Sequence, residues 1–367
     1  MSGWGGWGGW GGWGGWGGWG GWGAGGQAMP GPATNPTLAD ALIRSRGAIV
    51  KGPYDPPDLD AGFPGSIDDP AALGKWEPLI RFNVSMLELS SNLLFEKTAN
   101  GARLSHVQRV PSLLKPAEGT YQAQPIVEMV RPSKPFFEAQ LKLLFAYAKE
   151  REDRASEIIS QLAPQTPFWS AVANLQPNRT KFTFELIEVA LAFASIAAMR
   201  FKQALNCPRP VAYSSKVQPL VPTPEHSSLP SGHATEAFMV AHLLRSLIAT
   251  GRAPANGEAV FNLLNPLAGR IAVNRTVDGL HFPVDSVAGQ ILGATMGGYL
   301  VYVCTGGKLP GESAAGWRDR TFEPGSDLGK DFNWRDHLPT GGALHTLGAV
   351  NPMLRWLWEQ ASAEWKA

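Results

Sequence analysis

Three short segments in the second half of the chain carry side chains that could grip and attack a tetrahedral oxyanion. In order, they are residues 202–210 (KQALNCPRP), 230–233 (PSGH) and 275–285 (RTVDGLHFPVD). Together they supply three cations, two histidines, a serine hydroxyl and a carboxylate that could orient a histidine. Charged donors of this kind make the strongest hydrogen bonds to anionic oxygens. The three segments therefore predict a phosphate or vanadate site.

The first segment offers two cations. Lys202 and Arg209 are seven residues apart, which on a helix is about two turns and one face, so we expect both to reach the same ligand. Pro210 cannot continue a helix and favours an extended backbone at Arg209, which would turn the guanidinium into a cleft. Arginine can donate two parallel hydrogen bonds, whereas lysine acts as a point charge. Taken alone, such cations are more typical of a solvated helix surface.

The second segment predicts an anion site at the start of a helix. Residues 233–250 (HATEAFMVAHLLRSLIAT) have apolar side chains at helical spacing, and Gly251 can end the helix. Ser231, Gly232 and His233 would then lie at its N-terminus, where unpaired N–H groups favour an anion and glycine permits close approach. The Ser231 hydroxyl adds a donor, and His233 could protonate a leaving oxygen. The alternative is that Ser231 only caps the helix and His233 lies on the surface.

The third segment pairs a histidine with a carboxylate. His281 and Asp285 are four residues apart, so on one helical turn the carboxylate can hold one imidazole nitrogen and leave the other free. Such an imidazole can attack phosphorus or bind a metal-oxo centre. Arg275 is expected on the preceding loop as the third cation. An ordinary surface pair is the alternative, but the occurrence of all three segments in order favours a site.

The combined pattern K-x6-RP, PSGH and R-x5-H-x3-D resembles a known signature. It is similar to the one shared by type 2 phosphatidic-acid phosphatases, bacterial acid phosphatases and vanadium-dependent haloperoxidases, over about residues 185–307. The soluble bacterial members are the most similar. We therefore expect an all-α fold, with a helical bundle core in which helix ends or adjoining loops form the oxyanion site.

The resemblance implies a role for each matching residue. Five groups would hold the oxyanion: Lys202, Arg209, Arg275, the Ser231 hydroxyl and the Gly232 amide.

The reacting groups would be two histidines. The resemblance implies that His233 is the general acid, and that Asp285 orients His281. His281 would be the nucleophile in a phosphatase and the axial vanadate ligand, and so the metal ligand, in a haloperoxidase. One departure is visible, because the family often has serine where this chain has Asn274.

The reacting groups do not separate the two activities, because five-coordinate vanadate mimics the phosphoryl transition state. His226, five residues before Ser231, resembles haloperoxidases in which a histidine or phenylalanine borders the vanadate, although a histidine in this proline-rich loop could also be solvent-exposed. The stretch HFPVDSVAG is more similar to the phosphatase branch. We favour a phosphatase acting on a small phosphate ester without a cofactor. The alternatives are a haloperoxidase that uses vanadate, halide and peroxide, and a non-catalytic oxyanion-binding or assembly protein.

The net charge and the cysteine content limit the classes of protein to which this chain could belong. The formal net charge of the 367 residues is +1, so we expect no bulk electrostatic attraction to nucleic acid or membrane. Cys207 and Cys304 are too few for a disulfide framework, and Cys207 is expected to be a buried, inert thiol.

The first 26 residues are a repeat in which tryptophan recurs every third position between glycine pairs. Such a segment cannot pack a core, so we expect residues 1–35 to be a disordered tail and linker. The tail could mediate self-association or docking, or it could be a tolerated low-complexity expansion. It lacks the basic start, aliphatic run and cleavage site of a secretory signal, which favours a cytoplasmic location.

The rest of the chain divides into three further regions. Residues 36–130 are expected to wrap over the core as loops with strands around 79–89, and residues 131–310 to form the helical catalytic domain. Helices are predicted from residue 135 onward and over 180–206. Residues 286–307 carry no charge, but a buried helix is favoured over a membrane span because no comparable segment is seen. The extension 311–367 should end in a helix around 352–365 that docks through Leu354, Leu357 and Trp358.

Overall fold

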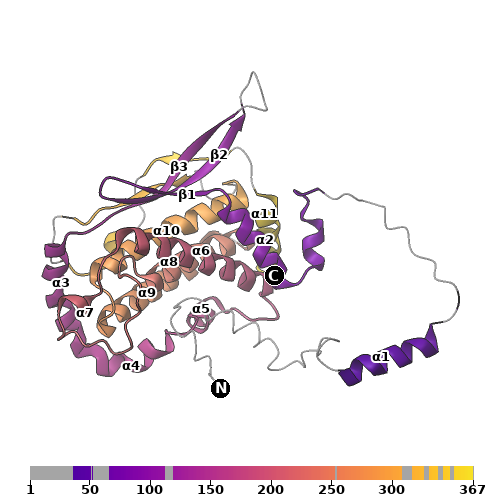
Figure 1. Ribbon diagram of the computed structural model, residues 1–367, viewed down its shortest axis with the longest axis horizontal. Coiled ribbons are helices and arrows are strands. Elements are labelled where there is room, and N and C mark those ends of the chain that lie inside the picture. The colour runs from indigo at the N-terminus through magenta and orange to yellow at the C-terminus, as the bar shows by residue number, and fades with distance from the viewer. Residues whose placement is uncertain are drawn as a thin grey trace. The chain divides into compact units, whose positions relative to one another are not determined.

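A computed structural model describes residues 36–50, 52, 66–111, 119–252, 254–307, 316–325, 330–337, 342–347 and 351–366 (Figure 1). The predicted Trp–Gly tail and linker, residues 1–35, lie outside these described residues. The chain separates into two compact units. Helix α1 (Pro36–Ile49) belongs to one unit, and residues 70–367 belong to the other, which contains the predicted site.

Long helices form the core of the larger unit: α6 (Lys181–Leu205), α8 (Gly232–Gly251), α9 (Pro254–Asp278) and α10 (Pro283–Thr305). Helix α8 packs against α6, α9 and α10 (Figure 1). Its inward side chains, such as Leu243 and Leu247, are fully buried, and burial of such apolar surface is the main driving force of folding. The expected all-α core is confirmed, and α6 and α8 match the helices predicted over 180–206 and 233–250.

Two glycines let α10 approach the first turn of α8. Gly289 and Gly293 are four residues apart and therefore share one face of α10. A Cβ atom on Gly289 would lie 2.7 Å from both the Ser231 carbonyl oxygen and the Ala234 Cβ, and one on Gly293 would meet the Thr235 backbone. Because only glycine fits, the two backbones come close enough for the Ser231 N–H to donate to the Asp285 carbonyl at 2.9 Å.

The predicted C-terminal helix is α11 (Pro352–Ala363), and it docks on the core as expected through Leu354, Leu357 and Trp358, which are all buried. Asn351 caps this helix by accepting hydrogen bonds from the backbone of its first turn. Just after α11, the Glu364 carboxylate accepts from the N–H groups of Phe182 and Thr183, at 2.8 and 2.9 Å. A carboxylate at a helix N-terminus is favourable, so Glu364 caps α6 from a distant part of the chain.

The region 70–130 differs from the expectation. Residues 78–90 form a helix, α2 (Pro78–Ser90), where strands were predicted. The strands lie further on: β1 (Leu93–Lys97), β2 (Gly101–Pro111) and β3 (Gly119–Val130) pair antiparallel, and β5 (Arg320–Phe322) adds parallel to β3. This sheet covers α6 and α10 (Figure 1). The segment therefore packs over the core as predicted, but as a helix and sheet rather than as loops.

Shorter elements complete the described part of the unit. They are η4 (Pro70–Lys75), α3 (Lys134–Tyr147), η5 (Ala148–Glu150), α4 (Arg151–Ser160), α5 (Thr166–Ala173), α7 (Pro210–Tyr213), β4 (Trp317–Arg318), η6 (Trp334–His337) and β6 (Leu344–His345). Helix α3 matches the helix predicted from residue 135. Strands β4 and β6 form a separate two-stranded sheet.

Two segments in the described part of the chain are long and apolar enough to cross a membrane, Lys181–Tyr213 and Pro283–Thr305. The first was overlooked in the sequence, where residues 286–307, which overlap the second, were judged to have no comparable partner. Most of each apolar stretch is buried inside the protein, 67% and 78% respectively. Core helices of soluble proteins pass the same test, so the two segments are weak evidence for a membrane span.

Candidate active site

The three predicted segments meet where the C-terminal ends of α6 and α9 approach the N-terminal ends of α8 and α10. The buried polar side chains gathered there are Lys202, Arg209, Ser228, Ser231, Asn274, Arg275, Asp278, His281 and Asp285. Gly232 and His233 are partly exposed, so the cluster opens to solvent at the start of α8. The structure thus brings together every residue predicted for the oxyanion cradle.

The ring of His281 is held on both sides. His281 Nε2 lies 2.9 Å from Arg209 Nη1, and His281 Nδ1 lies 3.0 Å from Asp285 Oδ2. A guanidinium can only donate, so Nε2 must accept, and the neutral ring carries its proton on Nδ1. Burial, reinforced by the charges of Arg209 and Lys202, lowers the pKa of His281 well below its ordinary value. His281 is therefore neutral at pH 7, with an unprotonated Nε2 directed at the cations.

The His281–Asp285 contact was predicted, but not its geometry. His281 lies in the segment before α10, and Asp285 lies in the first turn of the helix, which Pro283 begins. The carboxylate reaches back over the helix N-terminus and also accepts from the Phe282 N–H at 3.0 Å. A capping contact of this type restrains the side chain, so Asp285 is held by the N-terminus of the helix in which it lies.

Ser228 is a site residue that the sequence analysis missed. Its hydroxyl donates to Asp285 Oδ2 at 2.5 Å, its carbonyl accepts from Lys202 Nζ at 2.6 Å, and its N–H donates to the Cys207 carbonyl at 2.8 Å. Ser228 therefore connects the carboxylate to the first cation segment. A serine in a proline-rich loop is typical of solvated turns, so neither its type nor its position indicates this role.

Lys202 and Arg209 converge, although not along one helix. Helix α6 ends at Leu205, Asn206 adopts a left-handed conformation (φ 45°), and Arg209 is extended (φ −72°, ψ 157°) before the short helix α7. The expected shared helical face was therefore wrong, and the extended backbone before Pro210 was right. Lys202 Nζ donates to the Ser227 and Ser228 carbonyls.

His226 orients Arg209 rather than lying free in its loop. Arg209 Nε donates to the His226 carbonyl at 3.1 Å, and Arg209 Nη2 donates to His226 Nδ1 at 3.0 Å. Burial, together with the charges of Lys202 and Arg209, lowers the pKa of His226 to about 4. His226 is thus a neutral acceptor that fixes one edge of the guanidinium.

The N-terminus of α8 provides backbone donors. Ser231 is the N-cap, and its hydroxyl accepts from the Ala234 N–H at 3.4 Å. No other atom would lie within 4 Å of a Cβ on Gly232, so the helix start is open at this position. Open N–H groups at a helix N-terminus are well suited to bind an anion.

Arg275 lies in the last turn of α9, not on a loop as expected, because the helix runs on to Asp278 and turns only at Gly279 (φ 95°). Its Nη2 donates to the Ile158 carbonyl and to Gln161 Oε1, each at 3.1 Å. Its Nε and Nη1 are buried and make no hydrogen bond with the described residues, and the nearest carboxylate oxygen, Asp278 Oδ2, is 3.8 Å from Nη1. Arg275 thus has two buried nitrogen donors without a hydrogen-bond partner among the described residues.

His233 contacts a residue outside the three segments. Its Nε2 lies 3.0 Å from the carbonyl oxygen of Gln161, at the end of α4. Because a carbonyl only accepts, Nε2 carries the proton of the neutral ring and Nδ1 is the other, unprotonated nitrogen. Burial and the charge of Arg275 lower the pKa of His233 to about 3.

The electrostatics of the cluster favour an added anion. Burial lowers the pKa of Arg209 and of Arg275 to about 10, and burial together with Arg209 lowers that of Lys202 well below its ordinary value. Burial raises the pKa of Asp285 to about 6, although the Ser228 hydrogen bond opposes this shift. Three buried cations therefore lie near two buried carboxylates, Asp278 and Asp285, and an oxyanion between the cations would relieve their repulsion.

Cys207 is buried and unpaired, as expected for an inert thiol. Burial and the charge of Asp285 raise its pKa to about 12, which disfavours the reactive thiolate.

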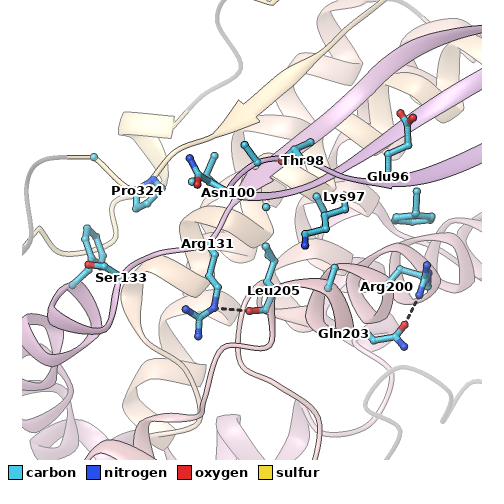
Figure 2. A pocket seen from close by; sticks show the side chains of 18 residues that line it. Glu96, Lys97, Thr98, Asn100, Arg131, Ser133, Arg200, Gln203, Leu205 and Pro324 are labelled. Atoms are coloured by element: carbon cyan, nitrogen blue, oxygen red, sulfur yellow. Dashed lines mark hydrogen bonds between the residues drawn. The ribbon is translucent and has the colours of Figure 1, made fainter.

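One pocket of the described residues is separate from this cluster. It has a volume of about 990 Å³ and lies between the β1–β2 turn, the end of β3 and the last turns of α6 (Figure 2). Arg131, on its wall, donates to the Leu205 carbonyl at 2.7 Å, and Arg200 contacts Gln203. None of the predicted site residues lines this pocket.

Comparison with known protein families agrees with the site. Residues 186–307, about a third of the chain, match the family model of the PAP2 superfamily, and they contain the cations, the two histidines and the carboxylate of the cluster. The chain therefore carries a PAP2 superfamily domain, which confirms the resemblance to type 2 phosphatidic-acid phosphatases and their relatives. The superfamily supports phosphatase-type phosphoryl transfer in general. No curated protein matches the chain.

Proposed function

We propose that the protein hydrolyses small phosphate esters, with His281 as the nucleophile and a phosphohistidine as the intermediate. The observation that supports this proposal is the pair of contacts on the His281 ring. Nε2 accepts from Arg209 and Nδ1 donates to Asp285, so the neutral ring keeps its lone pair on Nε2. An imidazole held in this way presents its lone pair to an electrophile that the cations bind. No cofactor is needed for this reaction.

In the first step, the Nε2 lone pair forms a bond to phosphorus as the bond to the leaving alcohol oxygen breaks. Arg209 Nη1 donates to that lone pair at 2.9 Å, so it has to transfer its hydrogen bond to a phosphoryl oxygen before attack. Lys202, Arg275 and the open N–H groups of α8 stabilise the charge on the remaining oxygens.

His233 supplies the proton that the leaving oxygen needs. The donor is Nδ1, because Nε2 is bound to the Gln161 carbonyl. With a pKa of about 3 the ring is neutral at pH 7. A bound phosphate-ester dianion would raise that pKa by offsetting the charge of Arg275, so Nδ1 would take up a proton from solvent when the ester binds and then transfer it to the leaving oxygen. In the second step a water attacks phosphorus, the N–P bond breaks, and His233 takes the proton of the water.

The test is to trap the intermediate. A rapid acid-free quench with radiolabelled phosphate ester should give labelled wild-type protein, with the acid-labile, base-stable behaviour of phosphohistidine. His281→Ala should lose both the label and turnover, by about 10⁴-fold or more. The matched control is His345→Ala, because His345 pairs with Asp319 outside the cluster. Hydrolysis that persists unchanged in His281→Ala would contradict the proposal.

A second candidate function is vanadium-dependent oxidation of halide by peroxide, favoured by the contact between His226 and Arg209. The resemblance noted above places a histidine beside the vanadate at this position in some haloperoxidases. The residues fit vanadate as well as phosphate, because the buried Arg275 Nε and Nη1 offer unused donors among the described residues. Lys202, Arg209, Arg275 and the start of α8 would hold its oxygens, and His281 Nε2 would be its nitrogen ligand. Bound vanadate would activate peroxide toward halide.

One titration separates the two candidates. Vanadate is added to the purified protein while hydrolysis of p-nitrophenyl phosphate and oxidation of bromide by peroxide are followed on the same sample. Loss of hydrolysis with no bromide oxidation would support the phosphatase, since vanadate mimics the transition state. Bromide oxidation that rises to a plateau would support the haloperoxidase instead.

A further inference from the structure

We propose that Gln161, which follows the last turn of α4, is a positioning residue that fixes both Arg275 and His233 in the oxyanion cradle. The proposal rests on the oxyanion-binding role given to the cluster above. Gln161 is fully buried and lies outside the three sequence segments and outside residues 186–307 that match the superfamily. It contacts the third cation with its side chain and the acid with its backbone.

The side chain of Gln161 restrains Arg275. Its Oε1 accepts from Arg275 Nη2 at 3.1 Å and from Asn274 Nδ2 at 3.0 Å. Both partners donate, so the oxygen and not the nitrogen of the amide has to face them, which determines the orientation of the amide. With Nη2 held by Gln161 and the Ile158 carbonyl, the guanidinium is fixed in one orientation, and its Nε and Nη1 remain buried without a hydrogen-bond partner among the described residues.

The backbone of Gln161 restrains His233. Its carbonyl accepts from His233 Nε2 at 3.0 Å, which leaves Nδ1 as the nitrogen available to a ligand. This hydrogen bond also raises the pKa of His233, against the larger effects of burial and Arg275. The C-terminal end of a helix carries a partial negative charge, so the end of α4 favours both Arg275 and a protonated His233.

Helix α4 is itself tied to α9, which makes Gln161 a rigid support. Glu157 pairs with Arg270 of α9 at 2.7 Å, and Arg154 Nη1 donates to Asn274 Oδ1 at 3.1 Å. Asn274 of α9 therefore joins this helix to α4, because it contacts both Arg154 and Gln161. This explains the departure noted in the sequence, because an asparagine can accept from Arg154 and donate to Gln161 at once, whereas a serine at this position is shorter.

The experiment measures binding of inorganic phosphate by calorimetry in the wild type and three variants. Gln161→Met keeps the length of the side chain and removes its three hydrogen bonds, two that Oε1 accepts from Asn274 and Arg275 and one that Nε2 donates to Glu157. Gln161→Glu keeps an acceptor oxygen for Arg275 and Asn274, but it replaces the amide that donates to Glu157 Oε1 and adds a negative charge beside Arg275. Gln290→Met is the matched control, because Gln290 is a buried glutamine of α10 that donates to the Trp334 carbonyl at 2.8 Å, outside the cluster.

We expect Gln161→Met to weaken phosphate binding about tenfold, because a charge-assisted hydrogen bond that orients a cation is lost. Gln161→Glu should weaken it further by neutralising the third cation, and should move the basic limb of the pH profile of kcat to higher pH by favouring protonated His233. Gln290→Met should bind phosphate as the wild type does. A role in packing alone would change the melting temperature without these two effects.

Each outcome is decisive. Phosphate binding within twofold of wild type in both Gln161 variants overturns the positioning role and leaves the proposed function standing. A wild type that binds neither phosphate nor vanadate overturns both. If Gln161→Met does not fold, Gln161→Glu decides alone, since it keeps the hydrogen bonds to Asn274 and Arg275.

Discussion

The hydroxyl of Ser228 lies 2.5 Å from Asp285 Oδ2, the same carboxylate oxygen that lies 3.0 Å from His281 Nδ1. This oxygen also accepts from the Phe282 N–H at 3.0 Å and so serves three donors, while Asp285 Oδ1 is buried and makes no hydrogen bond with the described residues. Burial raises the pKa of Asp285 to about 6, and the Ser228 hydroxyl is the largest influence that opposes the rise. Ser228 thus helps to keep ionised the carboxylate that orients the nucleophile.

Replacing Ser228 with alanine should raise the pKa of Asp285 further. A carboxyl whose pKa is raised is protonated at higher pH, so the acid limb of the kcat/KM profile should move to higher pH. We expect activity at pH 6 to fall about tenfold, with a smaller loss at pH 8 where Asp285 stays ionised. The control is Ser246→Ala, because Ser246 is a buried serine whose hydroxyl has no hydrogen bond among the described residues. Identical pH profiles for wild type and Ser228→Ala would argue against this role.

The two histidines should be opposite tautomers. His281 carries its proton on Nδ1, facing Asp285, and His233 carries its proton on Nε2, facing the Gln161 carbonyl. Nitrogen-15 NMR of histidine-labelled protein at pH 7 distinguishes protonated from unprotonated ring nitrogens. Spectra of His281→Gln and His233→Gln assign the signals. Finding both rings in the same neutral tautomer would contradict the geometry, and so would a charged ring in the absence of an anion, because burial lowers the pKa of each.

Site residues could be predicted from the sequence where the chemistry of the site requires a particular residue type. Cations, histidines and a helix start are recognisable from their identity and spacing, so the residues that the structure brings together at the ends of α6, α8, α9 and α10 could be predicted from the sequence, while their roles stay a prediction. Gln161 and Ser228 were not, because they act through tertiary contacts with His233 and Asp285, 72 and 57 residues away. From sequence alone, a glutamine at the end of a charged helix and a serine in a loop are expected to be solvated. Only the packing of α4 and α6 in the structure shows that Gln161 and Ser228 are buried.

The errors in local structure have a similar origin. Residues 79–89 were read as strand from their apolar content, yet the buried positions Arg81, Ser85 and Leu89 recur every four residues, as on a helix. Two of these three are polar, which hid the pattern. The Arg81 guanidinium is buried because it pairs with Glu185 of α6 at 2.5 Å. Only the packed structure shows that a charged residue belongs to the inward face.

Glu236 should make stability depend on pH. Burial raises its pKa from 4.5 to about 8, and the charge of Lys202 opposes the rise. The folded state thus keeps the Glu236 proton to higher pH than the unfolded state does. The contribution of protonated Glu236 to the free energy of unfolding is therefore fully present below pH 4.5 and is lost as pH rises through 8. Glu236→Gln has no proton to release and should raise the free energy of unfolding at pH 9 by ~2 kcal/mol relative to wild type, with little change at pH 5.

Urea denaturation of both proteins at pH 5 and pH 9 measures this difference. The exposed Glu359→Gln is the control, because its carboxylate is solvated in both states. A Glu236→Gln protein that is equally destabilised at both pH values would show that the carboxylate is ionised in the folded state.

Replacing Gly289 with alanine should weaken both the packing of α8 against α10 and the binding of phosphate. The new Cβ would lie 2.7 Å from both the Ser231 carbonyl oxygen and the Ala234 Cβ, so α8 has to move away from α10. Overpacking of this kind costs about 1–3 kcal/mol of stability. Because Ser231 and Gly232 begin α8, the same movement should weaken phosphate binding.

Gly298→Ala is a matched control on the same helix, since its Cβ would meet only His242 Nε2 at 3.6 Å, an ordinary contact. Thermal unfolding and phosphate calorimetry on both variants test the link. If Gly289→Ala loses stability and still binds phosphate like wild type, the start of α8 does not contribute to the cradle.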